Sequence, residues 1–127
     1  MSMLDTYRNN LLRKREEAAK LNQDLAKEQA KIAPLQQKII SANAAIGRTK
    51  SASTIKSKLN EIERANKAIA DTQKKVGDIQ KKLAQKEKEI AAAEKTYHNE
   101  ETKVNKKAAD AEKKRIQEAS RQSAALE

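Results

Sequence analysis

The sequence contains no cysteine, tryptophan or phenylalanine, and only two glycines, two tyrosines and one proline among its 127 residues. The absence of cysteine excludes disulfides and thiolate metal sites. Large side chains are too few to fill a globular core, and no apolar run approaches the length that a membrane-spanning helix needs. The N-terminus also lacks the apolar segment of a secretory signal. What remains is 36% charged and rich in Ala, Lys, Glu and Gln, which is typical of long helices or a coiled coil.

Two series of apolar residues run through the chain at heptad spacing. From Leu4 to Ile46 they alternate in steps of three and four residues, which predicts a helix over 4–46. From Ile55 a second series advances in steps of seven, which predicts a helix over 54–125 after a turn over 47–53. The predicted coiled-coil core consists of Leu4, Tyr7, Leu11, Leu21, Leu25, Ile32, Leu35, Ile39, Ile46, Ile55, Ile62, Ile69, Val76, Ile79, Leu83, Ile90 and Tyr97.

The two series match when the chain folds back on itself. Positions whose numbers add to about 101 then face each other, and apolar residues meet apolar residues. The polar positions agree as well, since Glu28 faces Thr72 and Lys14 faces Lys86. This agreement favours an antiparallel pairing of the two helices.

The expected fold is therefore all-α, a long antiparallel helical hairpin over 4–97 within a single coiled-coil domain over 1–127. Ala42 against Lys58, near the turn, is the one mismatch in the pairing. Large apolar residues nearly vanish towards the C-terminus. The segment 98–125 is therefore expected to overhang as a helix that leads to a C-terminal domain missing from this sequence.

Glycine, serine and proline residues interrupt the helical pattern. Gly47 is expected to end the first helix, and Ser51 or Ser53 to cap the second, because a serine hydroxyl can accept a hydrogen bond from a free N–H in the first turn. The apolar rhythm continues through Pro34, which favours a kinked but continuous helix. The alternative is a break at Ala33, with Pro34 starting a new helix.

A further stripe of mostly small residues follows each apolar series at a spacing of seven. Small side chains permit close approach of another helix, and the mid-helix Gly77 fits this interpretation despite its low helix propensity. We expect two hairpins to pack through these stripes into a dimeric four-helix bundle. The predicted dimer stripes are Leu12, Ala19, Ala26, Ala33 and Ile40 on the first helix, and Ala70, Gly77, Ala84 and Ala91 on the second.

Nothing in the sequence predicts catalysis, cofactor binding or metal binding. His98 is the only histidine, and no other residue is spaced to share a metal or acid–base site with it. There is no phosphate-binding glycine loop and no usable catalytic triad. The chain is therefore expected not to be an enzyme and to need no cofactor.

The net charge of +10 permits anionic partners. Most lysines are interleaved with acids, as in a self-pairing helix face, but Arg48, Lys50, Lys56 and Lys58 surround the turn without one. Aromatic residues for base stacking are missing, so nucleic-acid binding is not favoured. The alternative function is nevertheless a basic coiled coil that binds nucleic acid or an anionic surface. A free-standing adaptor that captures another protein's helix is a third possibility.

Residues 46–90 carry a resemblance to a known family. They read IGRTKSASTIKSKLNEIERANKAIADTQKKVGDIQKKLAQKEKEI, with an Ile-Gly turn, a Ser/Thr run and Lys- and Gln-rich heptads. This segment resembles the N-terminal coiled-coil region of bacterial TIR-domain proteins. The turn carries the resemblance, whereas the heptads resemble those of any basic coiled coil.

The resemblance implies a scaffold for a C-terminal TIR domain, which in many members cleaves NAD⁺ when it self-associates. The expected partners are a second copy of the chain and that TIR domain, which is absent here, so no catalytic residue of the family has a counterpart. The resemblance also implies a bacterial cytoplasmic protein, although export as an effector stays open. Roles in phage defence and in virulence, through interference with host innate immunity, remain equal alternatives.

Overall fold

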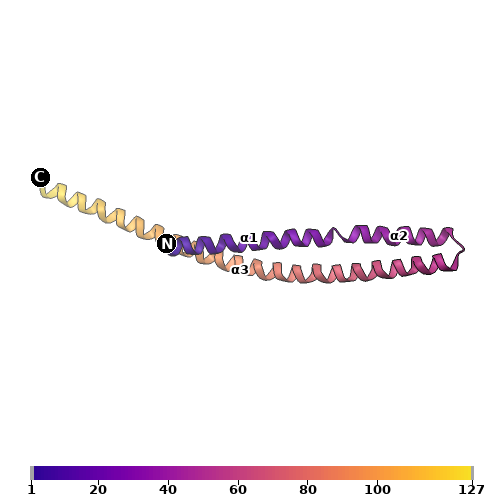
Figure 1. The fold of residues 1–127 in the computed structure, drawn as a ribbon. Coiled ribbons are helices and arrows are strands. Elements are labelled where there is room, and N and C mark those ends of the chain that lie inside the picture. Colours follow the sequence, from indigo (N-terminus) through magenta and orange to yellow (C-terminus); the bar gives the residue numbers. More distant parts are fainter. Residues whose placement is uncertain (1, 127) are drawn as a thin grey trace. The chain divides into compact units, whose positions relative to one another are not determined.

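The computed structural model describes residues 2–126, which form three α-helices and no strand (Figure 1). The helices are α1 (Met3–Gln29), α2 (Ile32–Arg48) and α3 (Ala52–Leu126). The prediction of an all-helical fold with long helices is therefore confirmed. It succeeded because heptad spacing of apolar residues is compatible with a helix and with no other regular structure.

Contacts between residues divide the chain into two units. Of the described residues, the first unit contains residues 2–15, which include the start of α1, and residues 88–126 of α3. The second consists of Glu16–Glu87, which includes the rest of α1, the whole of α2 and the first part of α3. Each unit therefore packs one stretch of α3 against residues from the N-terminal part of the chain.

In the first unit, α1 and α3 run antiparallel. The Lys14 ammonium lies 2.9 Å from the Glu89 carboxylate. Arg8 lies about one and a half turns before Lys14 on α1, and Tyr97 lies about two turns after Glu89 on α3. The positive charge of Arg8 acts to lower the pKa of Tyr97, so these two residues are also near each other. Lower residue numbers on α1 thus lie beside higher residue numbers on α3, as antiparallel packing requires. From residue 102 to residue 126 every side chain of α3 is exposed, so this segment makes no core contact within its unit.

In the second unit, the helices are also antiparallel. Glu17 of α1 and Lys86 of α3 form an ion pair at 2.6 Å. Further along, Ala42 of α2 and Lys58 of α3 line the same groove. The residue numbers of the first pair add to 103 and those of the second to 100, close to the predicted value of about 101.

The helix predicted over 4–46 is interrupted at Ala30 and Lys31, which separate α1 from α2. The prediction of a continuous kinked helix was therefore wrong, and the break lies upstream of the alternative position at Ala33. The cause is Pro34, which has no N–H to donate to the Ala30 carbonyl and whose ring clashes with that carbonyl. Pro34 itself lies in the first turn of α2, where a backbone N–H has no helical acceptor in any case.

The end of α2 also differs from the prediction. Gly47 does not end the helix, because α2 continues to Arg48 and no glycine among the described residues has a positive φ. Thr49 turns extended instead, while its N–H donates to the Ile46 carbonyl.

The connection between α2 and α3 is shorter than the predicted turn over 47–53, because α3 begins at Ala52 rather than at residue 54. Ser51 caps α3, since its Oγ accepts a hydrogen bond from the Thr54 N–H at 3.4 Å. Ser53 lies inside the helix, with its hydroxyl 3.1 Å from that of Ser51. Of the two predicted caps, Ser51 is the one that acts.

Replacing Pro34 by alanine tests the cause of the break. Pro34→Ala restores the N–H that can donate to Ala30 and removes the clash, so α1 and α2 are expected to join. We expect helical circular dichroism to increase and the free energy of unfolding to rise by about 1–3 kcal/mol. Gln37→Ala, an exposed change on the same helix that adds no backbone donor, is the control and is expected to change neither value. A lower stability of Pro34→Ala would contradict this explanation.

Candidate interaction surfaces

The predicted core residues line the contact between helices in each unit. All 17 are buried or half-buried, whereas the residues on either side of them are mostly exposed. The apolar residues with the least exposure are Leu11, Ala42, Ala65, Leu83 and Ala93, at 2–8%. Three of these five are alanines, so the contact, which we call the seam, is narrow and buries little apolar area.

Two lysines occupy seam positions and were predicted to face each other. The structure gives each a carboxylate partner in its own unit instead: Lys14 pairs with Glu89 at 2.9 Å and Lys86 with Glu17 at 2.6 Å. Both lysines are about one-fifth exposed, so solvent screens these pairs and each contributes modestly to stability. Heptad positions alone could not predict these partners, because a lysine side chain reaches acids that lie diagonally across the seam.

Glu28 and Thr72 form a polar position in the seam of the second unit. Thr72 is buried at 7% exposure, and the Glu28 side chain is 17% exposed. The Lys31 ammonium donates to Glu28 Oε1 at 2.8 Å, whereas Oε2 is buried without a hydrogen-bond partner. The hydrogen bond from Lys31 lowers the pKa of Glu28 below its usual 4.5, and the charges of Lys31 and Lys75 add to this effect against the opposing effect of burial.

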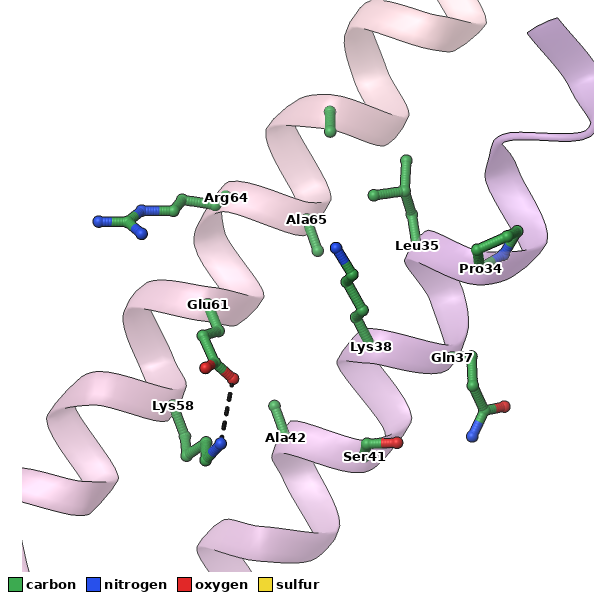
Figure 2. Close-up of a pocket in the computed structure, with 11 residues that line it drawn as sticks. Pro34, Leu35, Gln37, Lys38, Ser41, Ala42, Lys58, Glu61, Arg64 and Ala65 are labelled. Carbon is green, nitrogen blue, oxygen red and sulfur yellow. Dashed lines mark hydrogen bonds and ion pairs between the residues drawn. The ribbon is translucent and has the colours of Figure 1, made fainter.

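A groove of about 700 Å³ lies between α2 and α3 in the second unit (Figure 2). Its floor consists of the small seam residues Ala42 and Ala65, which are 2% and 4% exposed. The groove coincides with the mismatch that the sequence predicted, because Lys58 pairs with Glu61 at 3.3 Å and does not fill the space beside Ala42. Figure 2 shows the Lys38 side chain reaching from α2 towards Ala65.

The groove lies on one side of the seam in the second unit, and we call the two sides of the seam its flanks. Pro34, Lys38 and Ser41 of α2 line it from one helix, and Glu61 and Arg64 of α3 line it from the other. The predicted dimer stripes occupy the other flank of both helices, by the rotation of about 100° per residue in an α-helix. The stripes therefore lie on the side that is opposite the groove.

The stripe side of the second unit carries no charge over most of its length. The stripe residues alternate, at spacings of three and four, with asparagines and glutamines that the sequence analysis had not singled out. We call this set the uncharged face: Ala19, Asn22, Ala26, Gln29, Ala33, Gln36, Ile40, Asn43, Asn66, Ala70, Gln73, Gly77, Gln80 and Ala84. All are exposed except Gly77, which is half-buried. On α3 the same spacing meets Glu63 and Glu87 at the two ends of this set, so the uncharged run on that helix extends over residues 66–84.

Packing within the chain does not explain Gly77. A Cβ atom at this position would meet nothing within 4 Å, so alanine would fit. Glycine inside a helix costs about 1 kcal/mol relative to alanine. The two remaining stripe residues, Leu12 and Ala91, lie in the first unit and are also exposed.

In the first unit, the rings of Tyr97 and His98 lie close to each other. The Tyr97 hydroxyl donates to the Glu101 carboxylate, and this hydrogen bond, assisted by burial, raises the pKa of Tyr97. His98 is exposed, with its ring 5.7 Å from that of Tyr97 and its Nδ1 3.9 Å from Glu101. Over residues 2–126, no cluster of three or more histidines and acids is arranged to hold a metal ion.

No family model, curated protein or solved structure matches the chain. The resemblance of residues 46–90 to TIR-protein coiled coils thus remains an expectation from the sequence. None of the described helices combines the length and the apolar character that crossing a membrane requires.

The depressed pKa of Glu28 predicts a specific loss of stability in acid. A carboxylate whose folded-state pKa lies below its unfolded-state pKa contributes stability above the unfolded value, and this contribution disappears as the pH falls through the folded value. Glu28→Gln is therefore expected to lose less thermal stability than the wild type between pH 7 and pH 3. Melting curves followed by circular dichroism measure this difference. Glu63→Gln, an exposed change in the same unit, is the control and should lose as much as the wild type; equal losses in all three proteins would refute the role of Glu28.

Proposed function

We propose that the chain is a non-catalytic assembly module. It forms an antiparallel helical hairpin with coiled-coil packing along the seam, and two copies pair through the uncharged face into a dimeric four-helix bundle. The antiparallel contacts inside both units support the hairpin. The paired bundle holds two copies of a C-terminal effector domain near each other.

The observation that carries this proposal is the uncharged face. Exposed helix positions in a chain with 36% charged residues are expected to carry lysine and glutamate, which are good helix formers and favour solubility. The uncharged face shares with the centre of a protein interface the depletion of charged residues, and Ile40, which is 60% exposed, supplies it with a large apolar side chain. A second copy is the occupant that fits, because a two-fold interface uses the same patch on both subunits and would bring no charge into contact with another.

The exposed surface of the chain supports self-association. A compact monomer of this mass would expose about 6,800 Å², whereas this chain exposes 9864 Å². The difference is about 3,000 Å² for each chain, and the exposed segment of α3 over residues 102–126 contributes part of it. A second copy would cover part of this excess along the uncharged face.

The proposed effector is a bacterial TIR domain that hydrolyses NAD⁺. The resemblance of residues 46–90 supports this identification, and the exposed part of α3 beyond residue 101 is the proposed connection to the effector. A shared scaffold raises the local concentration of two weakly associating domains without any new contact between them. Under this proposal the chain contributes proximity, and the effector contributes the chemistry.

A charge on the uncharged face tests the dimer. Light scattering on the wild type at micromolar concentration should give twice the chain mass of 14.2 kDa. Ala70→Glu places two carboxylates in the interface, and we expect the dimer dissociation constant to rise at least about tenfold, or about 1.4 kcal/mol. Gln85→Glu is the control, because it adds the same charge to α3 outside this face and should leave the mass unchanged. A monomeric wild type, or equal effects of both variants, would reject the interface.

The effector is tested in the full-length protein. Reading the gene beyond residue 127 shows whether a TIR domain follows. If the proposal is correct, purified full-length protein consumes NAD⁺, and Ala70→Glu lowers the specific activity at dilute concentrations that raising the protein concentration then restores. Absence of NAD⁺ consumption would reject the effector but leave the dimer standing. Equal activity of wild type and variant at every concentration would reject the proximity mechanism.

A further inference from the structure

The end of the second unit where α2 meets α3 contains no acidic residue. Residues 41–58 include the four cations Arg48, Lys50, Lys56 and Lys58, without one aspartate or glutamate. We call this segment the acid-free end. At the chain's frequency of 18 acids in 127 residues, a segment of this length would hold two or three. Because α2 and α3 are joined by only three residues and run antiparallel, the last residues of α2 and the first residues of α3 lie at the same end of the unit (Figure 1).

Three of the four cations have no acidic partner among residues 2–126. Lys58 pairs with Glu61, an acid that lies just outside the segment. The three that remain are all exposed: Arg48, Lys50 and Lys56. The positive end of the α3 helix dipole adds to their field, since Ser51 satisfies only one of the free N–H groups there. This patch therefore attracts anions without competition from acids within the segment.

We propose that the acid-free end binds the phosphate backbone of nucleic acid. This is a binding function separate from the assembly function, because the uncharged face contains none of these cations. Electrostatic neutralisation of phosphates needs exposed, unpaired lysine and arginine side chains and nothing else. The patch supplies these, and it has no aromatic side chain that could stack on a base, so the binding is independent of nucleotide sequence.

The same surface fits other anionic partners less well. Within the acid-free end no large apolar side chain is exposed, since Ile46 and Ile55 are half-buried in the seam. The exposed Ile40 and Leu59 border this end, and Ile40 belongs to the uncharged face that the proposed dimer covers. Stable insertion into a membrane surface depends on exposed apolar side chains in addition to charge. Protein interfaces likewise depend on buried aromatic or apolar anchors. Phosphates along a nucleic-acid strand are the polyanion that requires neither.

The number of unpaired cations sets the expected salt dependence. If the three unpaired side chains each neutralise one phosphate of a DNA duplex, the logarithm of the association constant should fall with the logarithm of the salt concentration at a slope of about −2.7. Raising the salt from about 50 to about 200 mM should then weaken binding roughly 40-fold.

Fluorescence anisotropy with a labelled duplex of about 20 base pairs measures this slope. The triple variant Arg48→Gln/Lys50→Gln/Lys56→Gln is expected to bind at least about tenfold more weakly at 50 mM salt, with a slope reduced by about 2.7. The control, Lys103→Gln/Lys106→Gln/Lys107→Gln, removes the same charge from an exposed part of α3 outside the acid-free end. It should change affinity less than about threefold. Circular dichroism confirms that both variants keep the helicity of the wild type.

Three results would overturn the proposal. The first is failure of the wild type to bind the duplex at 50 mM salt. The second is an equal loss in both triple variants, which would mean that net charge, not this end, drives binding. The third is binding to vesicles that contain phosphatidylserine, lost in the Arg48 triple variant, without binding to DNA. The mass of the dimer should be the same in both triple variants, so failure here would leave the assembly proposal intact.

Discussion

The rest of the structure depends on the seam, the narrow line of apolar residues along each helix. Within each unit, the seam is the surface that the helices bury against each other, and it contains one apolar position every three or four residues. Several of the most buried positions are alanines, which contribute little hydrophobic area. Because so little is buried, the remaining helix positions stay in solvent, and their chemistry is free to serve purposes other than packing.

The chain uses the two flanks of this seam differently. In the second unit, the groove side carries Lys38, Glu61 and Arg64, and the opposite side carries the uncharged face. The charged flank is what a solvated helix requires. The uncharged flank is what close contact with another helix requires, because charge there would have to be desolvated or paired. Each helix buries one line of residues, the seam, and the two flanks are the surfaces on either side of it.

The sequence predicted the features that depend on the spacing of apolar residues, and it failed where the outcome depends on local backbone conformation or on the space between helices. The 17 core positions follow directly from steps of three, four and seven, and they are buried or half-buried. The break was misplaced because proline acts on the carbonyl four residues upstream, at Ala30, and not at its own position. Gly47 was misread because glycine permits a left-handed conformation without requiring one. The groove was visible beforehand only as the mismatch of Ala42 with Lys58, since a void depends on how far the side chains around two small residues, Ala42 and Ala65, fill the space between the helices.

Four positions of the uncharged face are costly for a chain that remains alone. Asparagine and glycine are poor helix formers, and Asn22, Asn43, Asn66 and Gly77 occupy helix positions where lysine or glutamate would stabilise the helix, by roughly a few tenths of a kcal/mol for each asparagine and by up to about 1 kcal/mol for the glycine. Within the described chain, Gly77 has no close neighbour that excludes a side chain, so the monomer has no use for it. A contact with another chain would offset this cost, because small side chains allow close approach and amide side chains can form hydrogen bonds across an interface without a desolvated charge. The unfavourable helix propensity at these four positions is therefore an argument that they function when covered.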